Sequence, residues 1–486
     1  MHGALDDTIC AIATPPGEGG IGVVRISGLH ACDVASQVVR LRSGKSLHDL
    51  RTHVMALADV GSPGAPQTVP RGTESRPHAV LDEALVVVMK GPHSYTGEDV
   101  VEVQCHGGPV VLDQLCRSLI SAGARLAEPG EFTKRAFLNG RLDLAQAEAV
   151  LDTIRAKTAR SLAIAQSQRR GELSREVEET RSGLVVALAH IEAALDFAEE
   201  DISFVRRDEL LRLLDETVSK LRGLVQSGQE GRIWREGAAV AILGRPNVGK
   251  SSLMNALLRS DRAIVTPIPG TTRDMLEEVV SIHGIPVRLF DTAGIRATDD
   301  PIEAEGIRRS HLAWEDADLA LILLDGSQPL LESDRLLLRR QEAAQALLVV
   351  NKCDLPSRIS KEDLIRVCPV NAGVLDISAK MQIGLDGLRD AISSRLMPRG
   401  LESREGVLVT NLRHAAAFER ALQGVEQARQ SVEAGMAGEL VAMDLRIAAD
   451  ALGEITGAIT TDEILERIFA EFCIGKLKDS CRECTV

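Results

Sequence analysis

A glycine-rich segment between a short apolar run and a helix-forming stretch constrains the fold of this chain more than any other feature. The apolar run covers residues 238–243, the segment reads Gly-Arg-Pro-Asn-Val-Gly-Lys-Ser from Gly244 to Ser251, and leucine, methionine and alanine dominate the stretch after Ser252. A strand, a glycine loop and a helix in this order place backbone N–H groups around an anion at the positive end of the helix. The pattern predicts a phosphate-binding loop in a doubly wound α/β domain, with Lys250 reaching the β- and γ-phosphates and Ser251 ligating magnesium.

Three later runs support this fold: residues 287–291 read as a second strand, and residues 319–325 and 347–351 are apolar. Continuous hydrophobicity is typical of strands that helices cover on both faces. The first run ends in Asp291-Thr292-Ala293-Gly294. We expect Asp291 just outside the direct magnesium ligands, and the Gly294 N–H free to contact the γ-phosphate.

The last of these runs leads into Asn351-Lys352-Cys353-Asp354, which selects the base. A carboxylate at Asp354 accepts two hydrogen bonds from guanine, and adenine would leave it unpaired. The Lys352 stem is expected to pack on the base, and Ser378-Ala379-Lys380 to complete the pocket through backbone N–H groups. Four motifs in register predict GTP binding and hydrolysis, and they disfavour a doubly wound domain without a nucleotide.

Two departures from an ordinary signalling GTPase bear on the mechanism. Ile295 follows the Asp-Thr-Ala-Gly motif, where a glutamine often orients the attacking water. The amide of Asn247 in the phosphate loop could ligate a monovalent cation, whose charge would replace that of an arginine finger. The alternative for Asn247 is an amide that only stabilises the loop.

The segment from Thr266 to Asp274 reads as a switch, with Thr272 as the second magnesium ligand. Potassium is expected to be held by Asn247 together with backbone carbonyls of Thr266, Ile268 and Thr271. The residues expected to contact GTP are Asn247, Val248, Gly249, Lys250, Ser251, Ser252, Thr266, Pro267, Ile268, Pro269, Gly270, Thr271, Thr272, Asp291, Thr292, Ala293, Gly294, Asn351, Lys352, Asp354, Ser378, Ala379 and Lys380.

Length and composition bound the remaining possibilities. A chain of 486 residues implies two to four domains, and 44% hydrophobic with 26% charged residues is typical of a globular protein. We find neither an apolar run of the ~18 residues that a membrane span needs nor a signal peptide, so we expect a cytoplasmic protein without membrane contact. A net charge of −14 and 2% aromatic residues argue against sequence-independent wrapping of nucleic acid. The nine scattered cysteines are expected to be reduced thiols.

The sequence around the nucleotide motifs changes character twice. Four short β-rich runs precede residue 122, and the stretch 41–77 is polar and rich in Gly, Pro and Arg, which predicts a loop. Helical patterns cover 142–228 and return after residue 396. We therefore expect multidomain α/β plus all-α architecture, in which a GTPase domain is inserted into a helical domain. The expected divisions are a mixed α/β domain 1–122, a helical domain 123–236 and 397–476, a GTPase domain 237–396, and an extension 477–486.

The chain resembles the family of tRNA-modification GTPases known as MnmE or TrmE over nearly its whole length. Widely separated segments carry the resemblance: Thr14–Gly17, Arg25–Gly28, Ser94–Asp99, His106–Pro109, Pro129–Thr133, Arg135–Asn139, Asp143–Ala149, Asn411–His414 and Phe472–Lys476.

The resemblance implies a potassium-activated GTPase with Mg²⁺ and an N-terminal domain that binds a tetrahydrofolate derivative (5-formyl or methylene form) and dimerises. It implies an FAD-containing partner, MnmG or GidA, with which the homodimer forms a heterotetramer. Together they place a carboxymethylaminomethyl or aminomethyl group on C5 of the wobble uridine of certain tRNAs.

The resemblance also implies roles for individual residues. Arg25, Glu102 and Arg141 match folate-contacting positions, although alone they read as ordinary surface charges. Glu303 matches the glutamate that orients the attacking water, with Glu305 as a rival. Cys473 lies in the segment where the family usually ends, and a chemical role for it stays open. Two alternative functions of the whole chain also stay open: a ribosome-assembly switch and a folate-dependent one-carbon transferase.

Overall fold

The computed structural model describes residues 7–61, 80–196, 207–261, 277–291, 317–339, 346–367, 373–397 and 407–472. The chain forms two compact units, residues 1–151 with 456–486, and residues 152–455. Within the described ranges, no helix combines the length and hydropathy that a membrane crossing requires.

The first unit is built on a seven-stranded sheet with strand order β3-β4-β5-β6-β2-β1-β7. Its pairs are antiparallel except β1 with β7. Helices α1 (Ala31–Val38) and α2 (Pro109–Ser121) contribute buried residues to the core of the sheet. The strands are β1 (Ile9–Ile12), β2 (Gly19–Ser27), β3 (Val39–Leu41), β4 (Met55–Gly61), β5 (Val80–Met89), β6 (Val100–Gly107) and β7 (Arg125–Leu126).

The four predicted β-rich runs are confirmed as β1, β2, β5 and β6, but the prediction of a loop over residues 41–77 was wrong in its first part. A short 3-10 helix, η1 (Leu47–Asp49), and the whole of β4 lie there. Strand β4 buries only alternate side chains, Ala58 and Val60, and pairs along its length with β5. Half-buried strands give a weak hydrophobic signal, because their other face stays in water.

Three helices complete the first unit from both ends of the chain. They are α3 (Glu131–Leu138), most of α4 (Leu144–Arg155) and α15 (Asp462–Ala470). Leu144 and Leu151 of α4 share a core with Phe469 of α15 and with Phe472. The C-terminal end of the described chain is thus packed against the N-terminal third of the sequence.

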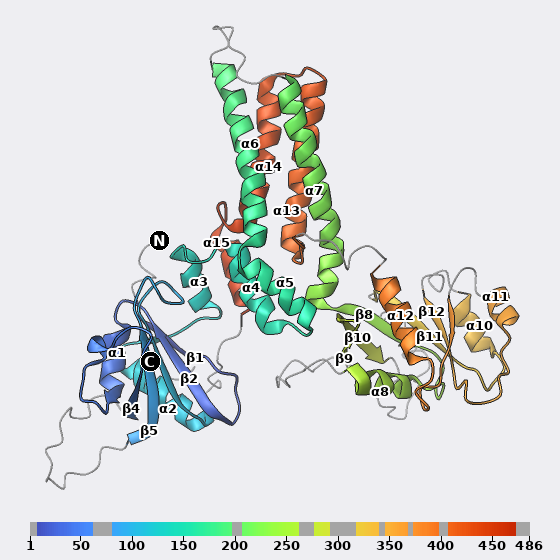
Figure 1. The fold of residues 1–486 in the computed structure, drawn as a ribbon, viewed down its shortest axis with the longest axis horizontal. Helices are drawn as coiled ribbons and strands as arrows, with labels where there is room; N and C mark the ends of the chain where they lie inside the picture. Colours follow the sequence, from blue (N-terminus) through green and yellow to red (C-terminus); the bar gives the residue numbers. More distant parts are fainter. Residues whose placement is uncertain are drawn as a thin grey trace, which may run out of the picture. The chain divides into compact units, whose positions relative to one another are not determined.

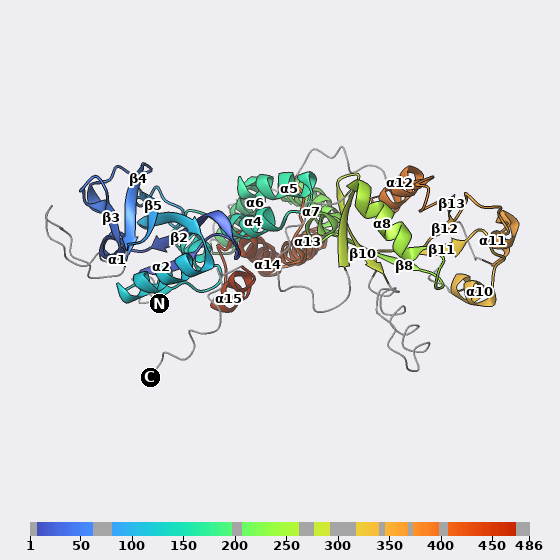
Figure 2. The same ribbon diagram turned by 90° about the horizontal axis from the view of Figure 1, so that it is seen from below.

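The helical part of the second unit confirms the two predicted helical stretches. Its helices are α5 (Ala159–Arg169), α6 (Glu172–Asp196), α7 (Arg207–Glu236), α13 (Leu412–Glu433) and α14 (Gly438–Thr456). Figures 1 and 2 show α6, α7, α13 and α14 side by side. Residues from before and after the predicted insertion therefore pack together, as at Gly231 of α7, where the backbone of Val409 passes closely.

The rest of the second unit is a six-stranded sheet with strand order β13-β12-β11-β8-β10-β9. All neighbouring strands are parallel except β9 and β10. The strands are β8 (Ala238–Leu243), β9 (Glu277–Ile282), β10 (Ile285–Asp291), β11 (Leu319–Asp325), β12 (Leu347–Asn351) and β13 (Val374–Asp376). The helices are α8 (Lys250–Asp261), α10 (Glu332–Leu338), α11 (Lys361–Val367) and α12 (Leu385–Leu396).

Both faces of this sheet are buried, which explains the continuous apolar runs. Val240 and Ile242 of β8 belong to one core, while Ala241 and Leu243 belong to a second core on the other face. The predicted doubly wound α/β fold is confirmed, and β8, β11 and β12 begin and end at the predicted residues.

Candidate functional site

The phosphate loop connects the buried strand β8 with α8. Its backbone is left-handed at Asn247 (φ 61°) and Gly249 (φ 104°), and α8 begins at Lys250. The Lys250 ammonium is buried within the loop and donates to the carbonyls of Gly244 (2.7 Å) and Arg245 (2.8 Å). Ser251 and Ser252 follow in the exposed first turn of α8. Figure 1 shows α8 beside the sheet.

Two glycines of this loop have no room for a β-carbon. A Cβ at Gly244 would lie 2.4 Å from the carbonyl oxygen of Leu323, and one at Gly249 would lie 2.2 Å from Nδ2 of Asn351. The loop is therefore in close contact with β11 and with the end of β12, where the base motif begins.

Asn351, the last residue of β12, joins three of the predicted motif segments. Its amide nitrogen donates to the carbonyl of Val248 in the phosphate loop (2.8 Å). Its amide oxygen accepts from the N–H of Ala379 (3.0 Å). Because Asn351 is buried, the loss of either hydrogen bond would leave a polar atom unsatisfied and would destabilise the site.

The other described residues of the base motif surround Asn351. The Lys352 ammonium donates to the carbonyl of Asn247 (3.1 Å), while Asp354 is exposed at the start of the next loop. Ser378 is buried and its hydroxyl accepts from the N–H of Met381 (3.1 Å), next to the exposed Lys380. The structure thus brings the phosphate loop, the Asn-Lys-Cys-Asp motif and the Ser-Ala-Lys segment together.

Sequence reasoning missed two buried carboxylates at this site. Asp334 of α10 accepts from Nε of Arg245 in the phosphate loop (2.8 Å), and Asp325 at the end of β11 accepts from Lys352 (2.6 Å). The signal for Asp325 was a charged residue ending an otherwise apolar strand. Asp334 gave none, because 89 residues separate it from Arg245.

Several predicted site residues lie outside the described residues, so the structure leaves their assignment as a prediction. They are Thr266, Pro267, Ile268, Pro269, Gly270, Thr271, Thr272, Thr292, Ala293, Gly294, Glu303 and Cys473. Asp291 is placed as the last residue of β10, beside β8 in the sheet.

A second group of predicted residues lies in the first unit. Arg25 of β2 and Glu102 of β6 are cross-strand neighbours, and Nε of Arg25 donates to Oε1 of Glu102 (2.8 Å). The guanidinium also lies over the rings of Tyr95 (5.3 Å) and Phe132 (5.6 Å). Arg141 follows α3 with an exposed side chain, which forms no hydrogen bond or ion pair with Arg25 or Glu102 in the described part of the chain.

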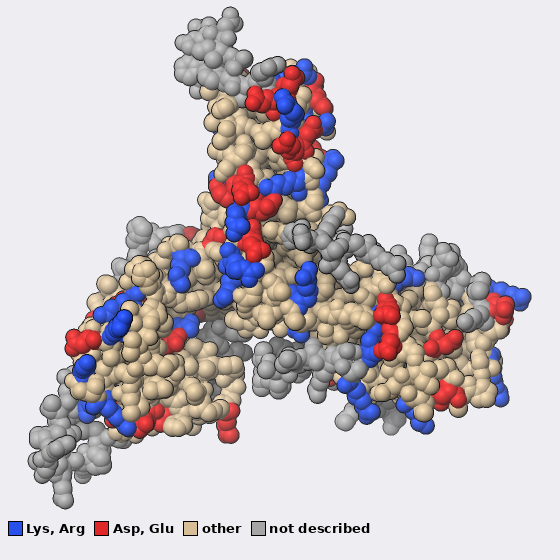
Figure 3. All heavy atoms as spheres, in the orientation of Figure 1, with Lys and Arg blue, Asp and Glu red and all other residues tan. Residues whose placement is uncertain are grey.

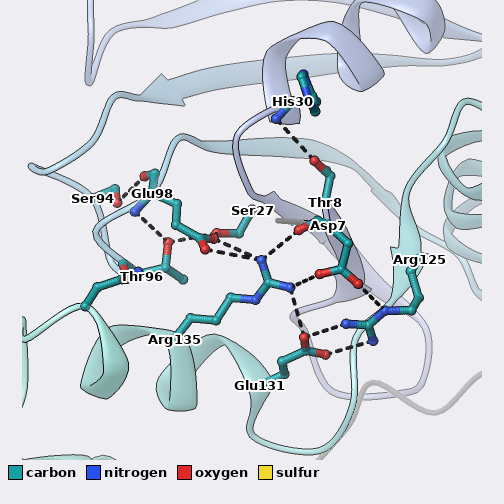
Figure 4. A network of polar contacts seen from close by, with 11 residues as sticks. Asp7, Thr8, Ser27, His30, Ser94, Thr96, Glu98, Arg125, Glu131 and Arg135 are labelled. Carbon is teal, nitrogen blue, oxygen red and sulfur yellow. Dashed lines mark hydrogen bonds and ion pairs between the residues drawn. The ribbon is translucent and has the colours of Figure 1, made fainter. Parts of the chain in front are cut away.

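Sequence reasoning missed a network around a buried arginine in the same unit, which is drawn in Figure 4. Arg135 of α3 is 1% exposed and contacts the side chains of Asp7 (2.6 Å), Glu98 (3.2 Å) and Glu131 (3.0 Å). Burial alone would raise the pKa of Asp7 and Glu131, but hydrogen bonds from Arg125 and Arg135 hold both below their ordinary values. Through Glu98 the network fixes the loop that carries Tyr95.

The mostly parallel sheet, the strand–loop–helix at Lys250 and the joined guanine motif define a P-loop GTPase. The family profiles agree: residues 8–141 match the GTP-binding protein TrmE N-terminus, and residues 144–473 match the MnmE helical domain. The chain belongs to the MnmE family of tRNA modification GTPases.

Curated relatives match over nearly the full length. The tRNA modification GTPase MnmE of Heliobacterium modesticaldum is 45% identical over 97% of this chain and 100% of its own length. The MnmE proteins of Geobacter sulfurreducens (44%) and Alkaliphilus oremlandii (42%) have the same coverage. Among solved structures, the G domain of the T. maritima FeoB iron transporter covers 32% of this chain and 98% of its own, at 29% identity and a TM-score of 0.25.

Proposed function

We propose that this chain hydrolyses GTP to GDP and phosphate in tRNA modification, as a potassium-activated enzyme. Acting with an FAD-containing partner of the MnmG type, it would install a carboxymethylaminomethyl or aminomethyl group at C5 of the wobble uridine. The observation that carries the proposal is Asn351, whose amide ties the phosphate loop to the guanine-binding segment in a family of tRNA modification GTPases.

We assign a separate role to each residue of the nucleotide site. Lys250 already lies inside the phosphate loop, where it would contact the β- and γ-phosphates, and Asp354 would select guanine. Magnesium would be held by Ser251 and Thr272, and potassium by Asn247 and by backbone carbonyls of Thr266, Ile268 and Thr271; both ions supply positive charge to the phosphates. Glu303 would orient the attacking water.

The residues around Arg25 fit a tetrahydrofolate derivative. Glu102 presents a carboxylate that can read a pterin edge, and Tyr95 and Phe132 offer aromatic faces beside it. Arg141 would contact the carboxylates of the glutamate tail. This assignment makes the first unit the site of the one-carbon donor.

The same sheet face supports a homodimer. Cross-strand pairs place Met55, Val87, Glu102 and Arg25 in one row across β4, β5, β6 and β2. Met55, Leu57 and Leu85 are 52%, 40% and 41% exposed on this face, beside the Arg25–Glu102 pair. A second copy would cover these apolar side chains, and the partner protein would complete a heterotetramer.

We also propose the domain boundaries expected from the sequence: residues 1–122, 123–236 with 397–476, 237–396, and 477–486. Cys473 stays a candidate for a chemical role in the modification.

Potassium activation is tested by comparing GTP turnover in potassium and in sodium. Asn247→Gly removes the amide and keeps a residue that accepts the left-handed backbone at this position. We expect potassium to raise the turnover of the wild type by orders of magnitude and to leave the variant nearly unchanged. Equal wild-type rates in both salts would remove potassium from the proposal.

Nucleoside analysis of tRNA from cells without the protein tests the modification itself. We expect the C5-modified wobble uridines to disappear, and Glu303→Ala to fail to restore them while still binding GTP. Unchanged wobble uridines would favour the alternative, a GTP-controlled ribosome-assembly or interaction switch.

A further inference from the structure

We propose that Asp325 is a positioning residue that holds Lys352 against the phosphate loop, so that the guanine loop and the phosphate loop are assembled before the nucleotide binds. This inference rests on the proposed GTP binding and adds a residue that none of the nucleotide motifs contains.

The carboxylate of Asp325 is fixed on both of its oxygens. Asp325 ends β11 directly opposite Asn351 of β12, and its side chain is 3% exposed. Oδ1 accepts from the N–H (3.0 Å) and the hydroxyl (2.6 Å) of Ser327. Oδ2 accepts from the ammonium of Lys352 (2.6 Å). Burial would raise the pKa of Asp325, but the hydrogen bonds from Lys352 and Ser327 lower it, which keeps the group ionised.

Lys352 connects Asp325 to the phosphate loop. Its backbone is left-handed (φ 67°), an uncommon conformation for a residue with a β-carbon. The same ammonium that contacts Asp325 donates to the carbonyl of Asn247 (3.1 Å), whose backbone is also left-handed (φ 61°). One ammonium thus bridges the end of β11 and the loop that would surround the phosphates.

The bridge lowers the entropic cost of binding a nucleotide. A lysine side chain in solvent has many rotamers, and ordering it on binding reduces affinity. Here Asp325 orders the ammonium in advance, while Lys352 remains 32% exposed and its stem stays available to the base. Loss of the carboxylate charge should therefore weaken the complex mainly by speeding its dissociation.

A purely structural role for Asp325 is the competing explanation, since Oδ1 stabilises the turn at Ser327. Asp325→Asn separates the two roles because an amide keeps the size and an acceptor oxygen for Ser327 but loses the charged contact with Lys352. Asp318→Asn is the matched control. Asp318 precedes β11 at its opposite end and is ion-paired with Arg232.

The experiment is a double-mutant cycle in the full-length chain, with fluorescent GDP as the probe. Lys352→Asn serves as the second variant, because asparagine tolerates a left-handed backbone. Asp325→Asn is expected to release GDP about tenfold faster than the wild type. In the Lys352→Asn background it should change the release rate little, because the contact is already lost. Asp318→Asn should release GDP at the wild-type rate.

Two results would overturn the inference. Wild-type release from Asp325→Asn would show that the contact does not hold the nucleotide site together. An equal acceleration with and without Lys352 would show that Asp325 acts on the fold alone. Failure of the wild type to bind GDP would instead refute the GTP-binding function on which the inference rests.

Discussion

At the scale of single residues, conformational strain and close contact occur together at the nucleotide site. Five non-glycine residues of the described chain have a positive φ, and two of them, Asn247 and Lys352, are joined by a hydrogen bond. Such conformations cost on the order of 1–3 kcal/mol each and persist where the surrounding structure enforces them. Here the ion pair with Asp325 and the hydrogen bonds of Asn351 enforce them.

Gly249→Ala is expected to reduce the affinity for GDP by at least about tenfold, since its β-carbon would displace the Asn351 amide. Isothermal titration calorimetry measures the change. Gly284→Ala is the control, since Gly284 is also left-handed (φ 82°) but has only a side-chain carbon at 4.0 Å from the built Cβ. Equal affinities of Gly249→Ala and Gly284→Ala would contradict the role given to the close contact.

The buried Arg135 predicts a pH dependence in the first unit. The fold lowers the pKa values of Asp7 and Glu131. These carboxylates therefore stabilise the fold at pH values above their pKa in the unfolded chain, and they lose that effect as the pH falls through their pKa in the folded chain. Arg135→Met leaves Glu131 buried without this partner, and it should lower the free energy of unfolding of the first unit by roughly 3–5 kcal/mol at pH 7. The cost should shrink toward pH 3–4, where protonation of these carboxylates removes the negative charge that Arg135 compensates.

Hydrogen exchange of the β1 and β2 amides at the two pH values measures this difference. A cost that is independent of pH would mean that Arg135 contributes packing and not charge.

At the scale of elements, the strands whose bounds could be predicted from the sequence are those buried on both faces of the sheet. Strands β8, β11 and β12 were predicted to the residue because both faces are buried, whereas β3 and β4 were missed because alternate residues face water. The motif residues of the nucleotide site could be proposed from the sequence because each motif is local in it. Asp325, Asp334 and the Arg135 network were not, because their partners are distant in sequence and only the folded chain brings them together.

Two glycines of α7 allow a matched test of helix packing. A Cβ at Gly231 would lie 1.8 Å from the carbonyl oxygen of Val409, whereas one at Gly223 would have no atom within 4 Å. Gly231→Ala should therefore destabilise the helical part by about 1–3 kcal/mol or more. Gly223→Ala should stabilise it by about 0.5–1 kcal/mol, since alanine favours the helix. Urea unfolding followed by circular dichroism compares the two, and a stable Gly231→Ala would show that residues 407–411 do not pack tightly on α7.

At the scale of the whole molecule, each unit combines segments that are remote in the sequence. The face drawn in Figure 3 carries acidic and basic side chains interspersed with one another. In the second unit, the helical and nucleotide-binding parts share residues: Ile233 of α7 is buried in the core of the six-stranded sheet, and Trp234 packs against it. The nucleotide-binding part therefore extends in its packing beyond the predicted boundary at residue 237.

A fragment of residues 229–397 should consequently be more stable than one of residues 237–397. The shorter fragment lacks Ile233, whose burial contributes about 1.5–3 kcal/mol, and the ion pair between Arg232 and Asp318. Thermal unfolding with and without GDP measures the difference. Identical midpoints would place the boundary of the independent domain at residue 237.

The junction between α7 and β8 has a mechanical consequence. Only Gly237, with a positive φ, separates the end of the 30-residue helix from the strand whose other end carries the phosphate loop. A helix of that length measures about 45 Å, so a tilt of about five degrees of β8 and α7 together would swing the far end of the helix by roughly 4 Å. Because Ile233 of α7 is buried in the core of the sheet, the helix would follow β8, and a small displacement beside the phosphate loop would become a larger one at the far end of α7.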